Sequence, residues 1–317
     1  MTKLFLGIEI GGTKLQLGVG PGDGSPFTAF ARRDVDISQG AAGILAQIEA
    51  AGTSLVAEHG VGRVGFGFGG PVDTAGGRVI KSHQVAGWGD VPLADWCREK
   101  LGVPAVLGND CDCAALAEAR FGAGQGRRIV FFVTVGTGIG GGLVIDGQLH
   151  GSGRPAVAEI GHMRVGTEAT SAEDTVESQA AGPAIAAAAR ALVDPFDPAD
   201  STRRDLLGDA LPEQLTAKAV GEAAARGNWL ARKALRGSIK TLAWAIAQVI
   251  TLTSAEVVVV GGGVSLIGDE HFFAPLRSQV AQYVFPPLAG SYEVVPAALG
   301  EEVVVHGALA LAAESDR

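Results

Sequence analysis

Apolar residues along the chain fall into short strand-like runs and longer stretches with the three-to-four-residue spacing of helices. Three strand-like runs each end in a glycine-rich turn: LFLGIEIGGTK at Leu4–Lys14, IVFFVTVGTGIGGG at Ile129–Gly142 and VVVVGGGVS at Val257–Ser265. A glycine turn after a strand frees several backbone N–H groups, which is a common way to bind phosphate. Three such turns together predict a nucleotide that is held from several sides.

The first two of these turns are not followed by helical patterns. The segments KLQLGVG after Thr13 and GGLVIDGQL after Gly140 alternate apolar and polar residues, as second strands do. Both turns are therefore predicted to be hairpin tips, unlike the Walker and dinucleotide loops, which lead into a helix. The same plan recurs about 125 residues later, so we predict two halves built on one pattern, with a cleft between them.

Strands alternate with helices along the rest of the chain. The pattern predicts strands at 27–33, 61–68, 103–107 and 257–260, and helices at 38–59, 92–100, 114–121, 183–192, 214–226, 229–252 and 303–313. Ser38 is the expected N-cap of the first helix, and residues 194–212 form the most turn-rich segment. This alternation indicates an α/β fold with a mixed sheet in each half.

Composition narrows the class of protein. The chain has 317 residues, of which 47% are hydrophobic and 19% charged, and this suits two well-buried domains. A formal charge of -9 without a basic run argues against nucleic acid as a partner. The apolar runs are too short to span a membrane, and the first predicted strand begins near the N-terminus. We therefore expect cytoplasmic residence without membrane attachment. Cys97, Cys111 and Cys113 are expected to be reduced thiols.

Asp110 is the sharpest candidate for chemistry in the chain. It stands where the apolar strand VPAVLGN gives way to a helix, and side chains at strand ends point into clefts. The same position suits a helix N-cap, which by itself is the commoner role for an aspartate. The neighbouring Asn109 favours a functional role, because two adjacent polar side chains at such a corner can hold a hydroxyl group.

Other charged residues form two further groups. Glu159, His162 and Glu177 could converge on a polyhydroxylated ligand, although a histidine near a glutamate is more often a surface pair. Glu9 interrupts a very apolar strand beside the first glycine turn. A carboxylate in such a strand is costly unless it is paired or faces a cation, so Glu9 is a candidate for a functional role.

Taken in order, these motifs resemble the ROK family (repressors, open reading frames, sugar kinases) of the actin-like ATPase and hexokinase superfamily over essentially the whole chain. GIEIGGTK is similar to the family's first phosphate motif, VTVGTGIGGG to its second and VVVGGGVS to its adenosine motif. GFGGPVD and AGW resemble sugar-side loops, GNDCDCAALAEARFG the segment with the catalytic aspartate, and AEIGH the sugar-contact signature. The resemblance implies two actin-like, ribonuclease H-like domains.

The resemblance also implies a role for individual residues. Asp110 would be the base that accepts the proton of the sugar hydroxyl. The implied sugar contacts are Asn109, Glu159, His162, Glu177 and Gly70. The residues around the ATP phosphates would be Gly11, Gly12, Thr13, Lys14, Gly136, Thr137 and Gly138. The residues against adenosine would be Gly261, Gly262 and Gly263. Magnesium would lie beside Glu9, directly or through water.

The chain departs from the family at several positions. Members usually bind a structural zinc through the AEIGH histidine and three cysteines, and here those cysteine positions hold Glu168, Thr170 and Thr175. Without thiolates we expect no such zinc site. Glu9 replaces an aspartate beside the magnesium, Gln84 replaces a sugar-side asparagine, and Gly108 replaces a glutamate. These changes affect the expected choice of sugar more than the class of reaction.

The resulting hypothesis is an ATP-dependent hexose kinase, glucokinase-like, that is a phosphotransferase with an alcohol acceptor. We expect an N-terminal domain of residues 1–109, completed by the helix within 303–317, a C-terminal domain of residues 110–302, and a homodimer by resemblance. One alternative is a non-catalytic ROK regulator that binds sugar or nucleotide without a DNA-binding domain, since the first phosphate motif begins at Leu4. Another is a kinase for an N-acetylated amino sugar, fructose or mannose.

Overall fold

The structure is a computed structural model that describes residues 2–82, 84–151, 153–154, 156–171, 173–193, 200–208 and 210–315. Packing divides the chain into two compact units. The first comprises residues 1–128, 142–158 and 298–317, and the second comprises residues 129–141 and 159–297. The expected boundary between residues 109 and 110 stays a prediction about functional domains. By packing, α3 (Asp110–Phe121) belongs to the first unit.

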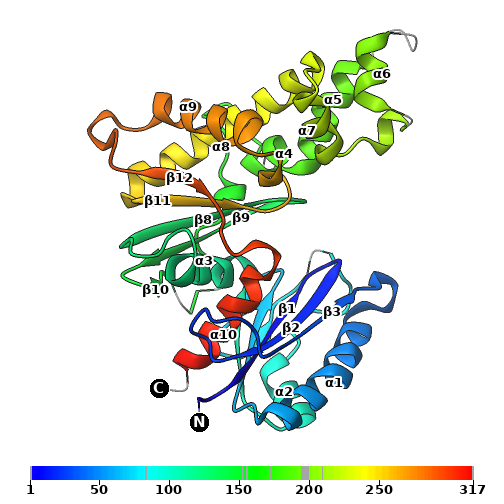
Figure 1. Ribbon diagram of the computed structural model, residues 1–317, viewed down its shortest axis with the longest axis vertical. Coiled ribbons are helices and arrows are strands. Elements are labelled where there is room, and N and C mark those ends of the chain that lie inside the picture. The colour runs from blue at the N-terminus through cyan, green and yellow to red at the C-terminus, as the bar shows by residue number, and fades with distance from the viewer. Residues whose placement is uncertain are drawn as a thin grey trace. The chain divides into compact units, whose positions relative to one another are not determined.

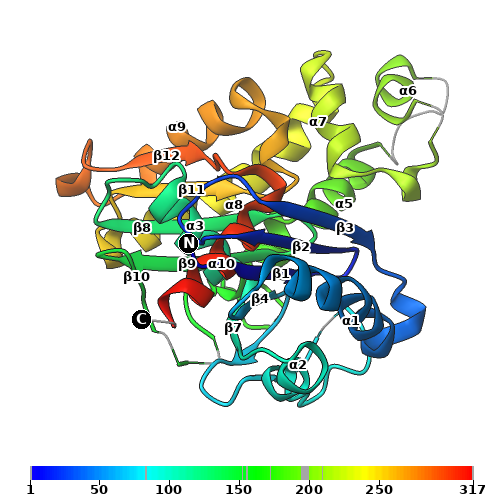
Figure 2. The same ribbon diagram turned by 60° about the horizontal axis from the view of Figure 1, so that its bottom comes forward.

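A five-stranded mixed sheet forms the centre of the first unit. Its order is β3-β2-β1-β4-β7, and Figure 2 shows these strands side by side. Strand β1 is antiparallel to β2 and parallel to β4, which is parallel to β7. The first glycine turn therefore joins two antiparallel strands, which confirms the predicted hairpin. The strands are β1 (Phe5–Ile10), β2 (Lys14–Gly20), β3 (Ala29–Asp34), β4 (Val64–Phe68) and β7 (Ala105–Asn109).

Helices cover both faces of this sheet (Figure 1). Helices α1 (Gly40–His59) and α2 (Leu93–Leu101) lie on one face, where Ile44 and Ile48 join the apolar strand residues in the core. Helix α10 (Val303–Glu314) packs on the other face against β1 and β4. Glycines allow this close approach, because a Cβ on Gly65 would lie 1.9 Å from the Ala308 carbonyl oxygen. The remaining elements are η1 (Ile37–Gln39), β5 (Val72–Asp73), β6 (Arg78–Val79) and η7 (Gly300–Glu302).

The second sheet repeats the pattern of the first. Its order is β10-β9-β8-β11-β12, in which β8 turns back into its neighbour β9 after only three residues and is parallel to its other neighbour β11. This repetition confirms the two similar halves predicted from the sequence. The strands are β8 (Ile129–Val135), β9 (Ile139–Ile145), β10 (Gln148–Leu149), β11 (Val257–Gly261) and β12 (Glu293–Pro296).

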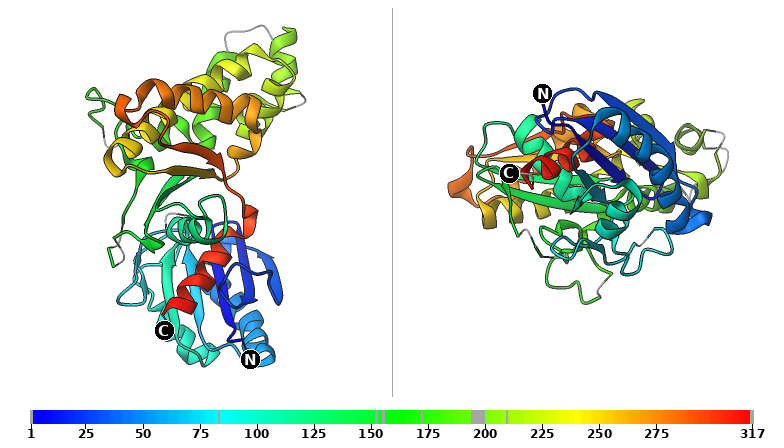
Figure 3. Two further views of the ribbon diagram at one scale, coloured as in Figure 1. Left: turned by 60° about the vertical axis from the view of Figure 1, so that its left-hand side comes forward. Right: turned by 90° about the horizontal axis from the view of Figure 1, so that it is seen from below.

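The helices of the second unit gather on one face of its sheet (Figure 3). Helix α8 is the longest and is mostly buried along one side, where it contacts α5, α7 and α9. The helices are η2 (Ile160–His162), α4 (Val176–Ala180), α5 (Gly182–Val193), α6 (Ser201–Leu207), η3 (Pro212–Gln214), α7 (Ala217–Ala225), α8 (Trp229–Thr253), η4 (Ser265–Ile267), η5 (Asp269–Phe273), α9 (Ala274–Tyr283) and η6 (Pro286–Leu288).

Some local expectations are corrected by the structure. Ser38 is not the N-cap before α1. Asp36 takes that role for the short η1 turn, because its Oδ1 accepts the Ser38 N–H at 3.0 Å. Helix α3 begins at Asp110 rather than at residue 114, and α6 lies inside the turn-rich segment, of which residues 194–199 and 209 are outside the described part. Among the described residues, only Ile37–His59 is long and apolar enough to cross a membrane, and Ile44 and Ile48 there are core residues of the first unit.

Candidate active site

Three parallel strands of the first unit end at the same level. Ile10 of β1 pairs with Phe68 of β4, and Phe68 pairs with Asn109 of β7. The backbone N–H of Gly69 then donates to the Ile10 carbonyl oxygen at 2.9 Å. The first glycine turn, the GGP turn and the Asn-Asp pair are therefore neighbours at the carboxyl edge of one sheet. This edge is where open α/β sheets bind ligands.

Asn109 and Asp110 share the start of α3 but differ in their contacts. Asn109 is the N-cap, since its Oδ1 accepts the Cys111 N–H at 2.8 Å, and its Nδ2 donates to the Gly70 carbonyl oxygen at 3.0 Å. Asp110 Oδ1 accepts the same Cys111 N–H at 2.8 Å. Asp110 Oδ2 lies 3.5 Å from the position a Cβ would take on Gly69, so it faces the strand ends. The cap is thus Asn109, and the Asp110 carboxylate is directed toward the glycine turns.

Glu9 is a buried carboxylate with two polar neighbours. It is 7% exposed, and its Oε1 lies 3.4 Å from Lys14 Nζ. The fully buried Gln16 faces Glu9 across β1 and β2, and its amide nitrogen donates to Glu9 Oε2 at 2.7 Å in the orientation that satisfies both amide atoms. Burial raises the pKa of Glu9 to about 7, the Lys14 charge opposes this rise, and the carboxylates of Asp110 and Glu301 add to it.

This arrangement bears on magnesium. The carboxylates of Glu9 and Asp110 are the hard oxygen donors that magnesium prefers. Both Glu9 oxygens, however, already accept from Lys14 and Gln16. The residues therefore fit a magnesium ion that is held through water better than one bound directly to Glu9.

Gln84 lies over the first glycine turn. A Cβ on Gly12 would be 1.8 Å from Gln84 Oε1, so only glycine leaves room for this side chain. The Gln84 backbone N–H donates to Ser82 Oγ at 3.1 Å, and the Val85 N–H donates to the same oxygen at 3.1 Å. The loop that holds the unusual glutamine is thus ordered by Ser82 and brings an amide group to the predicted phosphate turn.

In the second unit, three predicted motifs meet at the tip of the second hairpin. Glu177 Oε2 accepts the Ile139 N–H at 2.7 Å. The Gly182 N–H donates to the Gly136 carbonyl oxygen at 2.8 Å, and the Val264 N–H donates to the Val135 carbonyl oxygen at 2.9 Å. These bonds hold the predicted phosphate turn, which comprises Gly136, Thr137 and Gly138, against the predicted adenosine turn, which comprises Gly261, Gly262 and Gly263.

The AEIGH segment lies beside the same hairpin. A Cβ on Gly161 would be 1.9 Å from the Ile139 carbonyl oxygen, so the glycine lets η2 lie directly on the start of β9. Glu159 precedes η2, and His162 ends it. Partial burial raises the pKa of Glu159, His162 lowers it and Glu177 raises it, which shows that the three groups interact electrostatically. Glu177 and the segment that carries Glu159 and His162 thus both lie against Ile139, and the convergence of the three side chains on one ligand stays a prediction.

The loop before α4 is held by hydrogen bonds, among them those of Thr175, one of the positions where the family resemblance implies a cysteine. Thr175 is the N-cap of α4 and forms a capping box with Ser178. Upstream, the Ser171 N–H donates to Asp174 Oδ2 at 3.1 Å, and the Val176 N–H donates to the Met163 carbonyl oxygen at 2.9 Å. Across the described part of the chain, no group of three or more His, Cys, Asp and Glu side chains is placed to hold a metal ion.

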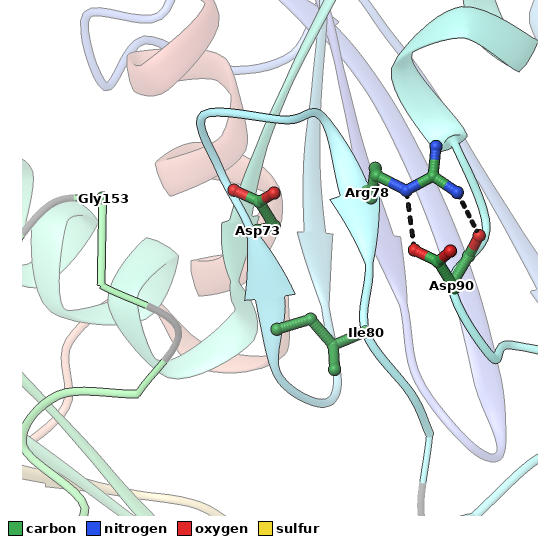
Figure 4. Close-up of a pocket in the computed structure, with 5 residues that line it drawn as sticks. All are labelled: Asp73, Arg78, Ile80, Asp90 and Gly153. Carbon is green, nitrogen blue, oxygen red and sulfur yellow. Dashed lines mark hydrogen bonds and ion pairs between the residues drawn. The ribbon is translucent and has the colours of Figure 1, made fainter.

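A separate pocket of about 290 Å³ lies in the first unit (Figure 4). Its lining includes Asp73, Arg78, Ile80, Asp90 and Gly153. The Arg78 guanidinium donates to Asp90 Oδ1 and to the Asp90 carbonyl oxygen, both at 2.7 Å, and Asp73 Oδ1 accepts the Gly76 N–H at 2.9 Å. The charged groups of the pocket are thus already engaged, and none of the candidate site residues lines it.

Sequence reasoning missed three polar residues that hold the first hairpin or the segment that contacts it. They are Gln16, Glu118 and Glu301. A signal for Gln16 exists, because it interrupts an apolar strand opposite Glu9 just as Glu9 interrupts its own. Glu118 and Glu301 lack such a signal, because Glu118 accepts from the backbone of Ala298 and the Glu301 carbonyl oxygen accepts from Lys14, and both partners are distant in sequence.

Comparisons with known proteins extend over the whole chain. Residues 5–315 match the ROK family. A glucokinase of Thermotoga maritima is 33% identical over 322 residues, which cover 99% of each chain. A ROK family glucokinase from Streptomyces griseus, solved in complex with glucose and AMPPNP, has a TM-score of 0.82 at 30% identity and covers 98% of this chain and 99% of its own. A ROK hexokinase from Thermus thermophilus has a TM-score of 0.79 at 26% identity, with 99% of each chain covered.

Proposed function

The chain belongs to the ROK family, and from that premise we propose that it transfers the γ-phosphoryl group of ATP to a hydroxyl group of a hexose. The fold agrees, with two sheets of one pattern as in actin-like domains. The observation that carries the proposal is that β1, β4 and β7 all end at the same edge of the sheet. There the Asp110 carboxylate lies beside the first glycine turn and the GGP turn.

Asp110 is the proposed base. Phosphoryl transfer requires the protein mainly to position acceptor and donor and to neutralise charge. Asp110 Oδ2 faces the strand ends, where it can accept the proton of an attacking hydroxyl group. Asn109 is the N-cap of α3, so the proposed role of Asp110 as base is distinct from capping the helix.

The donor is proposed to be ATP with its magnesium ion. Backbone N–H groups of both hairpin turns, together with the Lys14 ammonium group, would face the phosphates. The residues assigned to the phosphates are Gly11, Gly12, Thr13, Lys14, Gly136, Thr137 and Gly138. Gly261, Gly262 and Gly263 are assigned to adenosine. Magnesium neutralises phosphate charge, and Glu9 is proposed to hold it through water.

The acceptor is proposed to be glucose, which the Streptomyces griseus relative holds in its crystal structure. Contacts to the sugar are assigned to Asn109, Gly70, Glu159, His162 and Glu177. The Asn109 amide is fixed by Gly70, and Glu177 contacts Ile139, against which the segment with Glu159 and His162 also lies. Hydrogen-bonding groups that are fixed before the sugar binds discriminate among hexoses by the hydroxyl groups they match.

The test is an assay of sugar phosphate formation with glucose, mannose, fructose, N-acetylglucosamine and N-acetylmannosamine, each with ATP or inorganic polyphosphate as donor. We expect glucose with ATP to give the highest kcat/KM. A higher value for another sugar would change the acceptor and keep the reaction class. If no pair of sugar and donor gives turnover while calorimetry detects sugar binding, the non-catalytic regulator would be favoured.

The homodimer and the cytoplasmic location remain predictions. Light scattering coupled to size exclusion tests the homodimer.

A further inference from the structure

Glu118 is a fully buried carboxylate in the last turns of α3. Its Oε1 accepts the backbone N–H groups of Ala298 and Leu299, each at 2.9 Å, and its Oε2 accepts the Ala123 N–H at 2.8 Å. A buried charge is costly unless it is paired or hydrogen-bonded. Three backbone donors meet that requirement, and such charge-assisted bonds are stronger than neutral ones.

The donors come from two places in the first unit. Ala123 follows the end of α3, where a Cβ on Gly122 would lie 2.1 Å from Glu118 Oε2, so a glycine is needed beside the carboxylate. Ala298 and Leu299 are the first residues of the chain's last passage into the first unit. Glu118 therefore binds this returning segment to the helix that begins with Asp110.

The returning segment continues directly to the first glycine turn. Two residues after Leu299, the Glu301 carbonyl oxygen accepts from Lys14 Nζ at 3.1 Å. It also accepts from the Gln16 amide nitrogen at 3.1 Å in the satisfied orientation of that amide. The Glu301 side chain lies outside this connection, since it pairs with Arg32 at 2.6 Å on the surface. Residues 298–301 thus connect α3 to the lysine of the phosphate turn.

We propose that Glu118 is a positioning residue for phosphoryl transfer: by holding residues 298–301 against α3, it sets Lys14 relative to Asp110. This inference rests on the proposed function, in which Lys14 faces the phosphates and Asp110 faces the acceptor. Neither group touches Glu118, so the carboxylate acts through the backbone of the returning segment.

Replacing Glu118 by Gln weakens the attachment of residues 298–301 to α3 while the volume of the side chain stays nearly the same. An amide offers one acceptor oxygen in place of two, and its NH2 group faces backbone N–H groups that need an acceptor. The segment would shift, and with it the Glu301 carbonyl oxygen that fixes Lys14. A shift of this kind reduces the alignment of acceptor and donor in the transition state while the contacts to each bound substrate persist.

The experiment measures kcat and both KM values for the wild type, Glu118→Gln and Glu314→Gln. Glu314 is the matched control, because its carboxylate also contacts α3, through Arg120, but does not touch residues 298–301. We expect Glu118→Gln to lower kcat by on the order of tenfold with both KM values within about twofold, and Glu314→Gln to keep kcat. Wild-type kcat in Glu118→Gln, or an equal loss in Glu314→Gln, would overturn the positioning role.

Two further measurements separate the possible failures. If Glu118→Gln does not fold, hydrogen exchange on the wild type decides: the amides of Ala298, Leu299 and Ala123 should exchange as slowly as those inside α3, and fast exchange would overturn the proposal. If the wild type itself phosphorylates no hexose, the proposed function fails. An active wild type with an unaffected Glu118→Gln variant refutes only the role of Glu118.

Discussion

Lys14 Nζ lies 3.4 Å from Glu9 Oε1, so the lysine of the first hairpin partly neutralises the buried carboxylate beside it. Gln16 supplies the second partner, and the Glu301 carbonyl oxygen accepts from both Lys14 and Gln16. A carboxylate with these partners can serve the stability of the sheet, a water-held magnesium ion or both. The two roles respond differently to substitution and to pH.

Glu9→Gln tests the magnesium role. If Glu9 holds magnesium through water, loss of its charge should raise the magnesium concentration needed for half-maximal rate by on the order of tenfold and leave sugar affinity nearly unchanged. Glu9→Asp, which keeps the charge, should retain activity. Rate is measured against magnesium concentration for all three proteins. Superimposable magnesium curves would remove Glu9 from the metal site and leave it a structural carboxylate.

The stability of the protein should depend on pH through the same residue. Burial raises the pKa of Glu9 from 4.5 to about 7, so the folded state holds this proton more tightly than the unfolded chain. The resulting stabilisation is fully present below pH 4.5 and is lost as the pH rises through about 7. Denaturant unfolding without nucleotide should therefore show the wild type losing on the order of 3 kcal/mol relative to Glu9→Gln across that window. Parallel curves for the two proteins would contradict the shifted pKa.

Asp110→Asn should separate catalysis from helix capping. The substitution removes the base but leaves the Asn109 cap, so α3 should keep its stability. Turnover should fall by about a hundredfold or more, while calorimetry still detects sugar binding. Near-normal turnover would mean that Asp110 has no role as base.

The zinc content of the protein is a further measurable property. Thr175 caps α4 at one of the positions where the family resemblance implies a zinc-binding cysteine, and Glu168 and Thr170 at the other two offer no thiolate. Elemental analysis after purification without chelators should find well below one zinc per chain, and a chelator should leave the melting temperature unchanged. Thr175→Ala should instead lower stability by about 1 kcal/mol through loss of the capping box. One tightly bound zinc per chain would refute this expectation.

Gly12→Ala should act through Gln84. The added methyl group would lie 1.8 Å from Gln84 Oε1 and would have to displace that side chain. If Gln84 serves the sugar side of the site, Gly12→Ala and Gln84→Ala should raise the sugar KM to a similar extent. The sugar KM of the double variant should then be no higher than that of either single variant. This corresponds to a coupling free energy between the two positions of about 0.5 kcal/mol or more. Strictly additive effects would show that Gln84 is not the group the methyl displaces.

The sequence by itself determined the local parts of this protein. Alternating apolar strands, glycine turns and helix periodicity predicted both hairpins, the mixed sheets and the order of the motifs, because these features depend on residues close together in the chain. It also placed Asp110 at the end of a strand. It misassigned two caps, giving Ser38 the role of Asp36 and naming Asp110 rather than Asn109 as the cap candidate of α3, because neighbouring polar side chains compete for the same N–H groups.

Only the tertiary structure decided which distant groups meet. Glycines such as Gly65 and Gly161 are required by a backbone that is far away in sequence and approaches within van der Waals distance. The contacts of Lys14 and Gln16 with Glu301 and those of Glu118 with Ala298 and Leu299 follow from where the returning segment at residues 298–301 lies, and no periodicity encodes that position. Burial of these polar groups is tolerated only when every donor and acceptor finds a partner, and that condition is met by the fold as a whole rather than by any single stretch of sequence.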